Sequence, residues 1–176
     1  SVARPGVVEA ERGSRLVDVL AAAEPHLSEA VLVGGYHGAW VPAPHLDVRL
    51  SRRDLAPHNA AIGAGVLHVL GDATCPVAFA AEVAAYLADE SARQCGPCVN
   101  GLPHLATSLA RLASGVRDRS LPEEIGRMSR LVTRRGACAH PDGTARFIAS
   151  TLDVFRRHVA AHLEGWCPTG ERRVAS

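Results

Sequence analysis

The sequence predicts an α+β protein in which a small domain of short strands precedes a four-helix bundle. Up to about residue 72, short apolar runs alternate with glycine and proline turns, a pattern typical of strands. From residue 74 onward, apolar residues recur at helical spacing in four segments joined by short loops. We therefore expect domains at residues 1–72 and 73–166, followed by a flexible tail at 167–176.

The first domain is expected to hold one short helix among its strands. Residues 1–13 predict a β-hairpin around Pro5-Gly6, and Ser14 is placed to cap a helix with Leu16 and Leu20 on its buried face. Gly34, Gly35 and Gly38 favour a tight turn over a phosphate-binding loop, because a strand rather than a helix is expected to follow them. Strands are expected at 31–33, 39–41, 46–50 and 66–70.

The second domain is expected to consist of four helices. The first runs from a Thr74 cap, with Pro76 in its first turn, to residue 91. The second covers 102–113, and the third begins at a capping box of Ser120 and Glu123 and ends at Gly136. The fourth begins at Asp142 or Thr144 and ends at Gly165. In an up-down bundle, the loops after the first and third helices lie at the same end.

Composition excludes several classes of protein. Of 176 residues, 47% are hydrophobic and 21% are charged, so a buried core is expected and wholesale disorder is not. The net charge is +1 and the basic residues are dispersed, which argues against a nucleic-acid partner. No apolar run approaches the ~20 residues of a transmembrane segment, and no signal peptide opens the chain. With five cysteines, an odd number, we expect a cytoplasmic protein rather than a disulfide scaffold.

Three cysteines form the candidate site. Cys95 and Cys98 are spaced as Cys-x2-Cys in the first bundle loop, and Cys138 lies in the loop between the third and fourth helices. Because these loops share one end of the bundle, the three thiols are expected to converge. Such convergence is how proteins build pockets for a metal ion or an iron–sulfur cluster.

Other interpretations of these residues stay open. The string Cys95-Gly96-Pro97-Cys98 is also that of a redox-active dithiol, although it follows a helix here rather than a strand. Zinc bound by the three cysteines with His140 or His104 is another possibility, and unligated thiols are a third. His158 and His162, spaced i and i+4, can bind a metal only adventitiously.

Two stretches of the chain resemble one known family. The residues Glu90-Ser91, Cys95-Gly96-Pro97-Cys98 and Gly101, followed by Cys138 and Asp142-Gly143, are similar to the iron–sulfur domain of the flavin-bearing, NADH-oxidising subunit of respiratory complex I. Related NAD-dependent hydrogenases and formate dehydrogenases share the pattern. Upstream, residues 31–42, 63–66 and 74–75 resemble the soluble-ligand-binding β-grasp (ubiquitin-like) domain that precedes the cluster domain in that family.

The resemblance implies a β-grasp domain followed by a helical bundle that binds a [4Fe–4S] cluster. In the family, the cluster takes electrons from FMN, reduced by NADH, and passes them to a ferredoxin-like or other iron–sulfur acceptor. The FMN and NADH sites belong to a domain that is not in this sequence, so that domain is an implied partner. The chain is therefore expected to transfer electrons without being catalytic alone.

One position departs from the family pattern of Cys-x2-Cys-x2-Cys with a distant fourth cysteine. The first of these cysteines falls on Ala92, which has no donor atom. The possible replacements for the fourth ligand are His140, His104, Cys167 and Cys75. A three-iron [3Fe–4S] cluster is a further outcome, and so is a non-redox docking or ligand-binding protein whose thiol site is empty or holds zinc.

Overall fold

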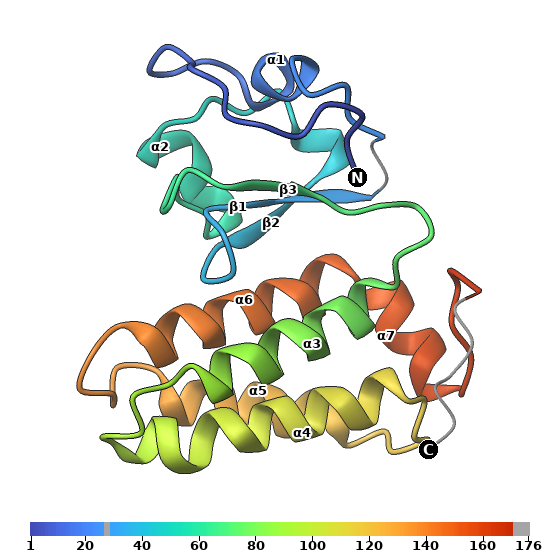
Figure 1. Cartoon of the computed structure of the whole chain (residues 1–176). Coiled ribbons are helices and arrows are strands. Elements are labelled where there is room, and N and C mark those ends of the chain that lie inside the picture. Colours follow the sequence, from blue (N-terminus) through green and yellow to red (C-terminus); the bar gives the residue numbers. More distant parts are fainter. Residues whose placement is uncertain (27–28, 171–176) are drawn as a thin grey trace. The chain divides into compact units, whose positions relative to one another are not determined.

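The computed structural model describes residues 1–26 and 29–170. Contacts divide the chain into two compact units, Ser1–Asp72 and Ala73–Ser176, which we call the sheet unit and the helical unit (Figure 1). A mixed α and β fold is confirmed, with one three-stranded sheet among the described residues. Within them, no helix is both long and apolar enough to span a bilayer. Most of the predicted tail, 171–176, lies outside the described residues.

The sheet unit is built around the central strand β1 (Ala30–Val33), in which every residue is buried. It pairs antiparallel with β2 (Ala39–Pro42) on one side and with β3 (Leu67–Val69) on the other. A strand therefore follows the glycine loop, as predicted. That loop is tight, because a Cβ at Gly38 would lie 2.0 Å from the Val33 carbonyl oxygen. The core also contains residues from other segments: Leu16, Leu20, Leu46, Leu55 and Ala60.

The predicted strand at 46–50 is wrong. The segment lies between the 3₁₀ turn η1 (Ala43–His45) and the short helix α2 (Arg52–Leu55), which is followed by η2 (Ala56–His58). Its backbone instead hydrogen-bonds to the start of α1 (Leu16–Ala21), where the Leu16 N–H donates to the Val48 carbonyl at 2.8 Å. The alternation that predicted a strand is real, since Leu46, Val48 and Leu50 all pack against the core.

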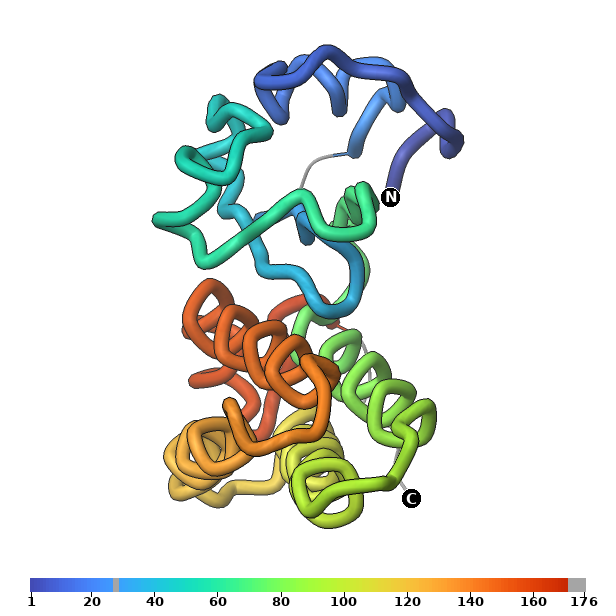
Figure 2. Tube along the Cα trace, turned by 90° about the vertical axis from the view of Figure 1, so that its left-hand side faces the viewer, coloured from blue at the N-terminus to red at the C-terminus, as the bar shows by residue number. Residues whose placement is uncertain are grey.

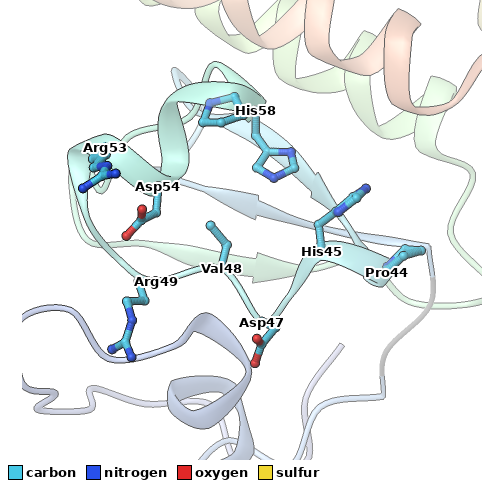
Figure 3. A pocket seen from close by; sticks show the side chains of 9 residues that line it. Pro44, His45, Asp47, Val48, Arg49, Arg53, Asp54 and His58 are labelled. Carbon is cyan, nitrogen blue, oxygen red and sulfur yellow. The ribbon is translucent and has the colours of Figure 1, made fainter.

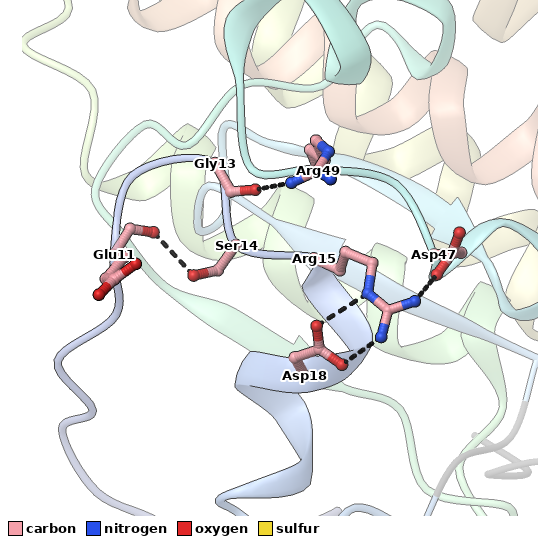
Figure 4. A network of polar contacts seen from close by, with 7 residues as sticks. All are labelled: Glu11, Gly13, Ser14, Arg15, Asp18, Asp47 and Arg49. Carbon is pink, nitrogen blue, oxygen red and sulfur yellow. Dashed lines mark hydrogen bonds and ion pairs between the residues drawn. The ribbon is translucent and has the colours of Figure 1, made fainter.

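Arginine side chains reinforce this pairing on the outside (Figure 4). Arg15 donates through two nitrogens to Asp18, at 2.8 and 2.9 Å, and through a third to Asp47 at 2.8 Å. Arg49 donates to the Gly13 carbonyl at 2.9 Å. These exposed ion pairs add little stability individually, but they fix the two segments side by side.

The predicted hairpin at 1–13 is also wrong. Val2 forms an isolated antiparallel bridge with Pro25, and the Ala3 N–H donates to the Glu24 carbonyl at 3.0 Å. The N-terminal segment thus pairs with the chain that follows α1 rather than with itself. Val7, on the expected returning strand, is fully exposed, so that strand would have had no apolar face to bury.

In the helical unit, four helices pack in a closed ring: α3 (Pro76–Asp89), α4 (Leu102–Ala113), α5 (Leu121–Val132) and α6 (His140–Val154). Each contacts the helix before it and the helix after it, and α6 returns to α3. Figure 2 looks roughly along their axes. Their buried faces carry the leucines predicted from helical spacing, among them Leu105, Leu109 and Leu112.

Helix termini differ from the prediction in several places: α5 ends at Val132 rather than Gly136, and α6 begins at His140 rather than Asp142 or Thr144. The cap of α3 is Cys75 rather than Thr74, and its sulfur accepts from the Ala78 N–H at 3.5 Å. The predicted capping box does not form, because the Ser120 hydroxyl donates to Asp118 at 2.6 Å. The predicted fourth helix is broken at Phe155 (φ −103°, ψ 37°), so that α7 (Arg156–Leu163) is a separate helix.

Candidate metal centre

Two segments meet at one end of the helical unit: residues 90–96, after α3, and residues 133–139, before α6 (Figure 1). The antiparallel course of the helices places them there. Each contains a non-glycine residue in the left-handed region, Arg93 (φ +52°) and Arg134 (φ +59°). Such backbone strain persists only where surrounding contacts hold it, and it is concentrated at functional sites. The Arg134 N–H, for example, donates to the Asp142 carboxylate at 2.7 Å.

The two segments approach each other at the sulfur of Cys95. The pKa of this thiol is lowered, chiefly because the Ala137 N–H donates to its sulfur and also because the Cys98 N–H does. Ala137 precedes Cys138, whose charge also acts on Cys98, so the third predicted cysteine lies near the first two. The three sulfurs are nevertheless not all within 4.8 Å of one another. A sulfur that accepts two backbone N–H groups is prepared to carry the negative charge of a metal-bound thiolate.

Cys98 is the most buried of the three, at 3% exposure. Its pKa is raised, first by burial and then by the hydrogen bond to Cys95 and the nearby charges of Cys95 and Cys138. The sequence predicted that Cys98 lies in a loop, but it lies in a π-helical turn, η3 (Pro97–Gly101), that runs directly into α4. Single π-turns are rare in proteins overall, and those that occur often lie at functional sites.

The neighbourhood of Ala92 tests whether a cluster fits. Ala92 is exposed and offers no side-chain donor, so it cannot act as the family's first ligand. Directly before it, the Ser91 hydroxyl is buried and has no hydrogen-bond partner among the described residues. Burying a hydroxyl without a hydrogen-bond partner destabilises the folded state unless a further group accepts its hydrogen bond. The donor set of three thiols plus this hydroxyl fits an iron–sulfur group.

The two candidate histidine ligands are both engaged. His140 is the first residue of α6, two positions after Cys138, and its Nε2 donates to the Leu87 carbonyl at 2.8 Å. The His104 Nε2 lies 2.6 Å from a Glu124 carboxylate oxygen, across the α4–α5 contact. Of the two, only His140 directly adjoins one of the converging segments.

Cys75 and Cys167, the other candidates, lie together elsewhere. Cys75 precedes α3, whereas Cys95 and Cys98 follow it, and the 14 residues of α3 separate these ends by roughly 21 Å at ~1.5 Å per residue. The donor atoms of Cys75, His162 and Cys167 all lie within 4.8 Å of one another. Sequence reasoning missed this group, because its members are far apart in the chain. The histidine spacing at 158 and 162 was its only visible signal.

The sheet unit carries a separate surface hollow of about 630 Å³ (Figure 3). Its lining alternates basic and acidic side chains, including Arg49, Arg53, Asp47 and Asp54. His45 and His58 stack loosely at one edge, with ring centroids 5.2 Å apart. Burial, with the neighbouring charge of His45, lowers the pKa of His58. With its charges balanced, the hollow favours neither an anionic nor a cationic ligand.

Comparison with known proteins finds a matching family for most of the helical unit. Residues 78–162 match the family described as the NADH-ubiquinone oxidoreductase-F iron-sulfur binding region. The F 2 subunit of NADH-quinone oxidoreductase from Rhizobium meliloti (strain 1021) is 26% identical over 171 residues, which cover 93% of this chain and 40% of the relative. The HndC subunit of the NADP-reducing hydrogenase from Solidesulfovibrio fructosivorans is 26% identical over 136 residues, covering 77% of this chain and 28% of the relative.

Solved structures agree with the sequence comparison. The chain is similar to part of an NAD+-reducing [NiFe]-hydrogenase in the H2-reduced state, with a TM-score of 0.82 and 27% sequence identity. The match covers 94% of this chain and 28% of that one. The chain spans about 40% of the length of the first curated relatives it matches.

Proposed function

Because residues 78–162 belong to the family of the NADH-ubiquinone oxidoreductase-F iron-sulfur binding region, we propose that this chain holds an iron–sulfur cluster and relays electrons through it. Cys95, Cys98 and Cys138 would bind the cluster. The observation that carries the proposal is the approach of the Cys138 segment to the Cys95 sulfur, where the Ala137 N–H is the main cause of the lowered pKa of that thiol. When bound, the cluster supplies one-electron transfer.

The protein's own residues prepare the site. Cys95 is stabilised as a thiolate by backbone N–H groups, and Cys98 is shielded from solvent in η3. The Ser91 hydroxyl, buried and unpaired among the described residues, would donate a hydrogen bond to a cluster sulfur, and such a bond raises the reduction potential of a cluster. Arg93, Arg134 and Arg135, all exposed, act in the same direction because positive charge favours the reduced state.

We assign a [4Fe–4S] cluster whose fourth ligand is His140 or an exogenous group, with [3Fe–4S] as the form left when that ligand is missing. His140 is favoured because it begins α6 directly after the segment that contains Cys138. Its Nε2 would have to leave the Leu87 carbonyl in order to ligate, unless Nδ1 is the ligand. Replacing a thiolate by imidazole makes the cluster less negative and raises its potential.

The proposed domains and electron-transfer partners are those suggested by the relatives. We assign the sheet unit as a β-grasp domain and α3–α6 as a four-helix bundle, in a cytoplasmic protein. The electron donor would be an FMN- and NADH-binding domain, in the same longer chain or in a partner subunit. The acceptor would be a ferredoxin-like or other iron–sulfur protein. The greater length of the relatives supports this arrangement, since they extend well beyond the region matched here.

The test is electron paramagnetic resonance of anaerobically purified protein, as isolated and after dithionite, with iron and acid-labile sulfide quantified. We expect about four irons and four sulfides per chain for a [4Fe–4S] cluster, or about three irons and four sulfides for a [3Fe–4S] cluster. Cys138→Ser should abolish the signal, while Cys167→Ser, which removes a thiol outside the converging segments, should keep it. Protein without iron, or with equal iron in both variants, would refute the proposal.

A second function is favoured by one observation, the alanine at the position of the first family cysteine. It is a non-redox docking or ligand-binding protein whose converging thiols are empty or hold zinc. Three thiolates with His140 would satisfy a tetrahedral zinc site. The same experiment separates the two functions, because this one predicts colourless protein that folds equally well without iron.

A further inference from the structure

A second group of metal-binding side chains lies within the helical unit, at the opposite end of α3 from Cys95 and Cys98. The Cys75 sulfur lies 3.1 Å from His162 Nε2. The Cys167 sulfur completes the group, with all three donor atoms within 4.8 Å of one another. Cys75 is 1% exposed and His162 is 4% exposed, whereas Cys167 is partly exposed.

The backbone brings these three residues together from distant parts of the chain. Cys75 is the N-cap of α3, and His162 lies in the last turn of α7. After α7, Gly165 (φ +85°) reverses the chain, and the Trp166 N–H donates back to the Ala161 carbonyl at 3.1 Å. That reversal directs Cys167 toward Cys75, while the Cys167 sulfur lies 3.0 Å from the Thr169 hydroxyl.

The separations are close to those that a metal ion requires. Zinc binds sulfur at ~2.3 Å and imidazole nitrogen at ~2.0 Å, so a tetrahedral arrangement places the donors roughly 3.5–3.8 Å apart. The 3.1 Å between Cys75 and His162 is shorter than this by about half an ångström. Small side-chain rotations therefore suffice to admit an ion.

The chemistry of the group selects a soft or borderline divalent ion. Two thiolates and one imidazole suit zinc, whereas magnesium and calcium require oxygen ligands. The Cys75 sulfur also accepts the Ala78 N–H in the first turn of α3, where the helix dipole favours a thiolate. Partial exposure of Cys167 gives an ion access from solvent.

We propose that Cys75, His162 and Cys167 form a zinc site, with water or an external ligand in the fourth tetrahedral position. The ion links the beginning of α3, the end of α7 and the segment after α7. Such a link acts as a staple, because binding free energy at a site absent from the unfolded chain becomes folding free energy. The site is separate from the cluster proposed at Cys95, Cys98 and Cys138, and neither depends on the other.

The test measures zinc and iron in the full chain, purified anaerobically from zinc-supplemented cells. We expect about one tightly held zinc ion per chain, with a cobalt-substituted form that shows thiolate-to-cobalt charge transfer and tetrahedral visible bands. Cys167→Ser and His162→Gln should each lower zinc affinity at least about tenfold. His158→Gln is the matched control, because His158 is equally buried, at 4% exposure, one turn earlier in α7.

Each outcome decides the proposal. Zinc retained by His158→Gln and by Cys138→Ser but lost from Cys167→Ser supports it. Because Cys167 lies outside the helices, its variant remains informative if His162→Gln does not fold. Three results overturn the proposal: wild-type protein that takes up neither zinc nor cobalt, zinc that is lost from Cys138→Ser instead, or a Cys75–Cys167 disulfide in anaerobic protein analysed by mass spectrometry after thiol alkylation.

Discussion

Gly101 is the position where the structure makes the sharpest prediction about the cysteine segments. It ends η3 and adjoins α4, and a Cβ placed there would lie 2.2 Å from the Val132 Cγ1 of α5. Ordinary carbon–carbon contacts are about 3.5–4.0 Å, so in Gly101→Ala the new Cβ and the Val132 side chain must move apart by more than about 1 Å. Val132 is 2% exposed and β-branched in a helix, where its χ1 is nearly fixed, so rotation does not relieve the clash.

The expected cost is that of overpacking, about 1–3 kcal/mol in the free energy of unfolding of the helical unit. Urea unfolding of metal-free protein, followed by far-ultraviolet circular dichroism, measures it. Because Cys98 lies within η3, displacement of this turn from α5 should also move a proposed cluster ligand. Iron retention during gel filtration should therefore fall in the same variant.

Gly96→Ala is the matched control in the same segment. Both glycines have right-handed helical backbone angles, but a Cβ at Gly96 meets nothing within 4 Å. Replacing glycine by alanine in such a conformation is neutral or stabilises by up to about 1 kcal/mol. In the double variant with Val132→Ala, the clash disappears, so the destabilisation should be smaller than the sum of the single effects. Equal unfolding midpoints for Gly101→Ala and Gly96→Ala would refute the steric reasoning.

Three further predictions concern other parts of the chain. Gly38→Ala should destabilise the sheet unit by roughly 3 kcal/mol or more in thermal unfolding, because its Cβ would meet the Val33 carbonyl at 2.0 Å and backbone cannot rotate away; an unchanged midpoint would contradict this. Ala92→Cys should increase the iron content per chain and convert any three-iron paramagnetic resonance signal to a four-iron one. An unchanged spectrum would contradict this prediction. Burial raises the pKa of the Cys75 thiol from 9.0 to about 11. The folded state therefore holds its proton more tightly, and the stability of metal-free protein should be constant below pH ~9 and fall by about 3 kcal/mol toward pH ~11. Cys75→Ala should remove that slope in urea titrations.

The placement of the two cysteine-bearing loops at one end of the helical unit could be predicted because local signals determined it. Helical spacing fixed the number and direction of α3 to α6, and short loops made consecutive helices antiparallel neighbours. Placing two loops at one end then required no knowledge of packing detail. The effect of the Ala137 N–H on the pKa of Cys95 agrees with that placement of the loops.

The strand prediction at 46–50 failed because alternation reports which side chains are buried, not what the backbone pairs with. Leu46, Val48 and Leu50 bury alternate side chains, yet their backbone hydrogen-bonds to residues 14–17 along a short stretch and forms only an isolated bridge, Arg15 to Arg49. The hairpin at 1–13 failed for a related reason. The turn residues Pro5-Gly6 permit the chain to reverse, but the returning segment has no apolar surface to pack against, so a hairpin is not stabilised.

The second thiol group could not be predicted, because it depends on the break in the last helix. Phe155 is 1% exposed and leaves the helical conformation, so α6 ends at Val154 and α7 takes a new direction. Periodicity continues across the break and gives no sign of it, since Phe155 and Val159 both remain buried. His162 reaches Cys75 only through this redirection, and Cys167 only through the reversal at Gly165. The cysteines of the chain therefore divide between the two ends of α3: spacing in the sequence indicates one group, whereas tertiary structure alone assembles the other.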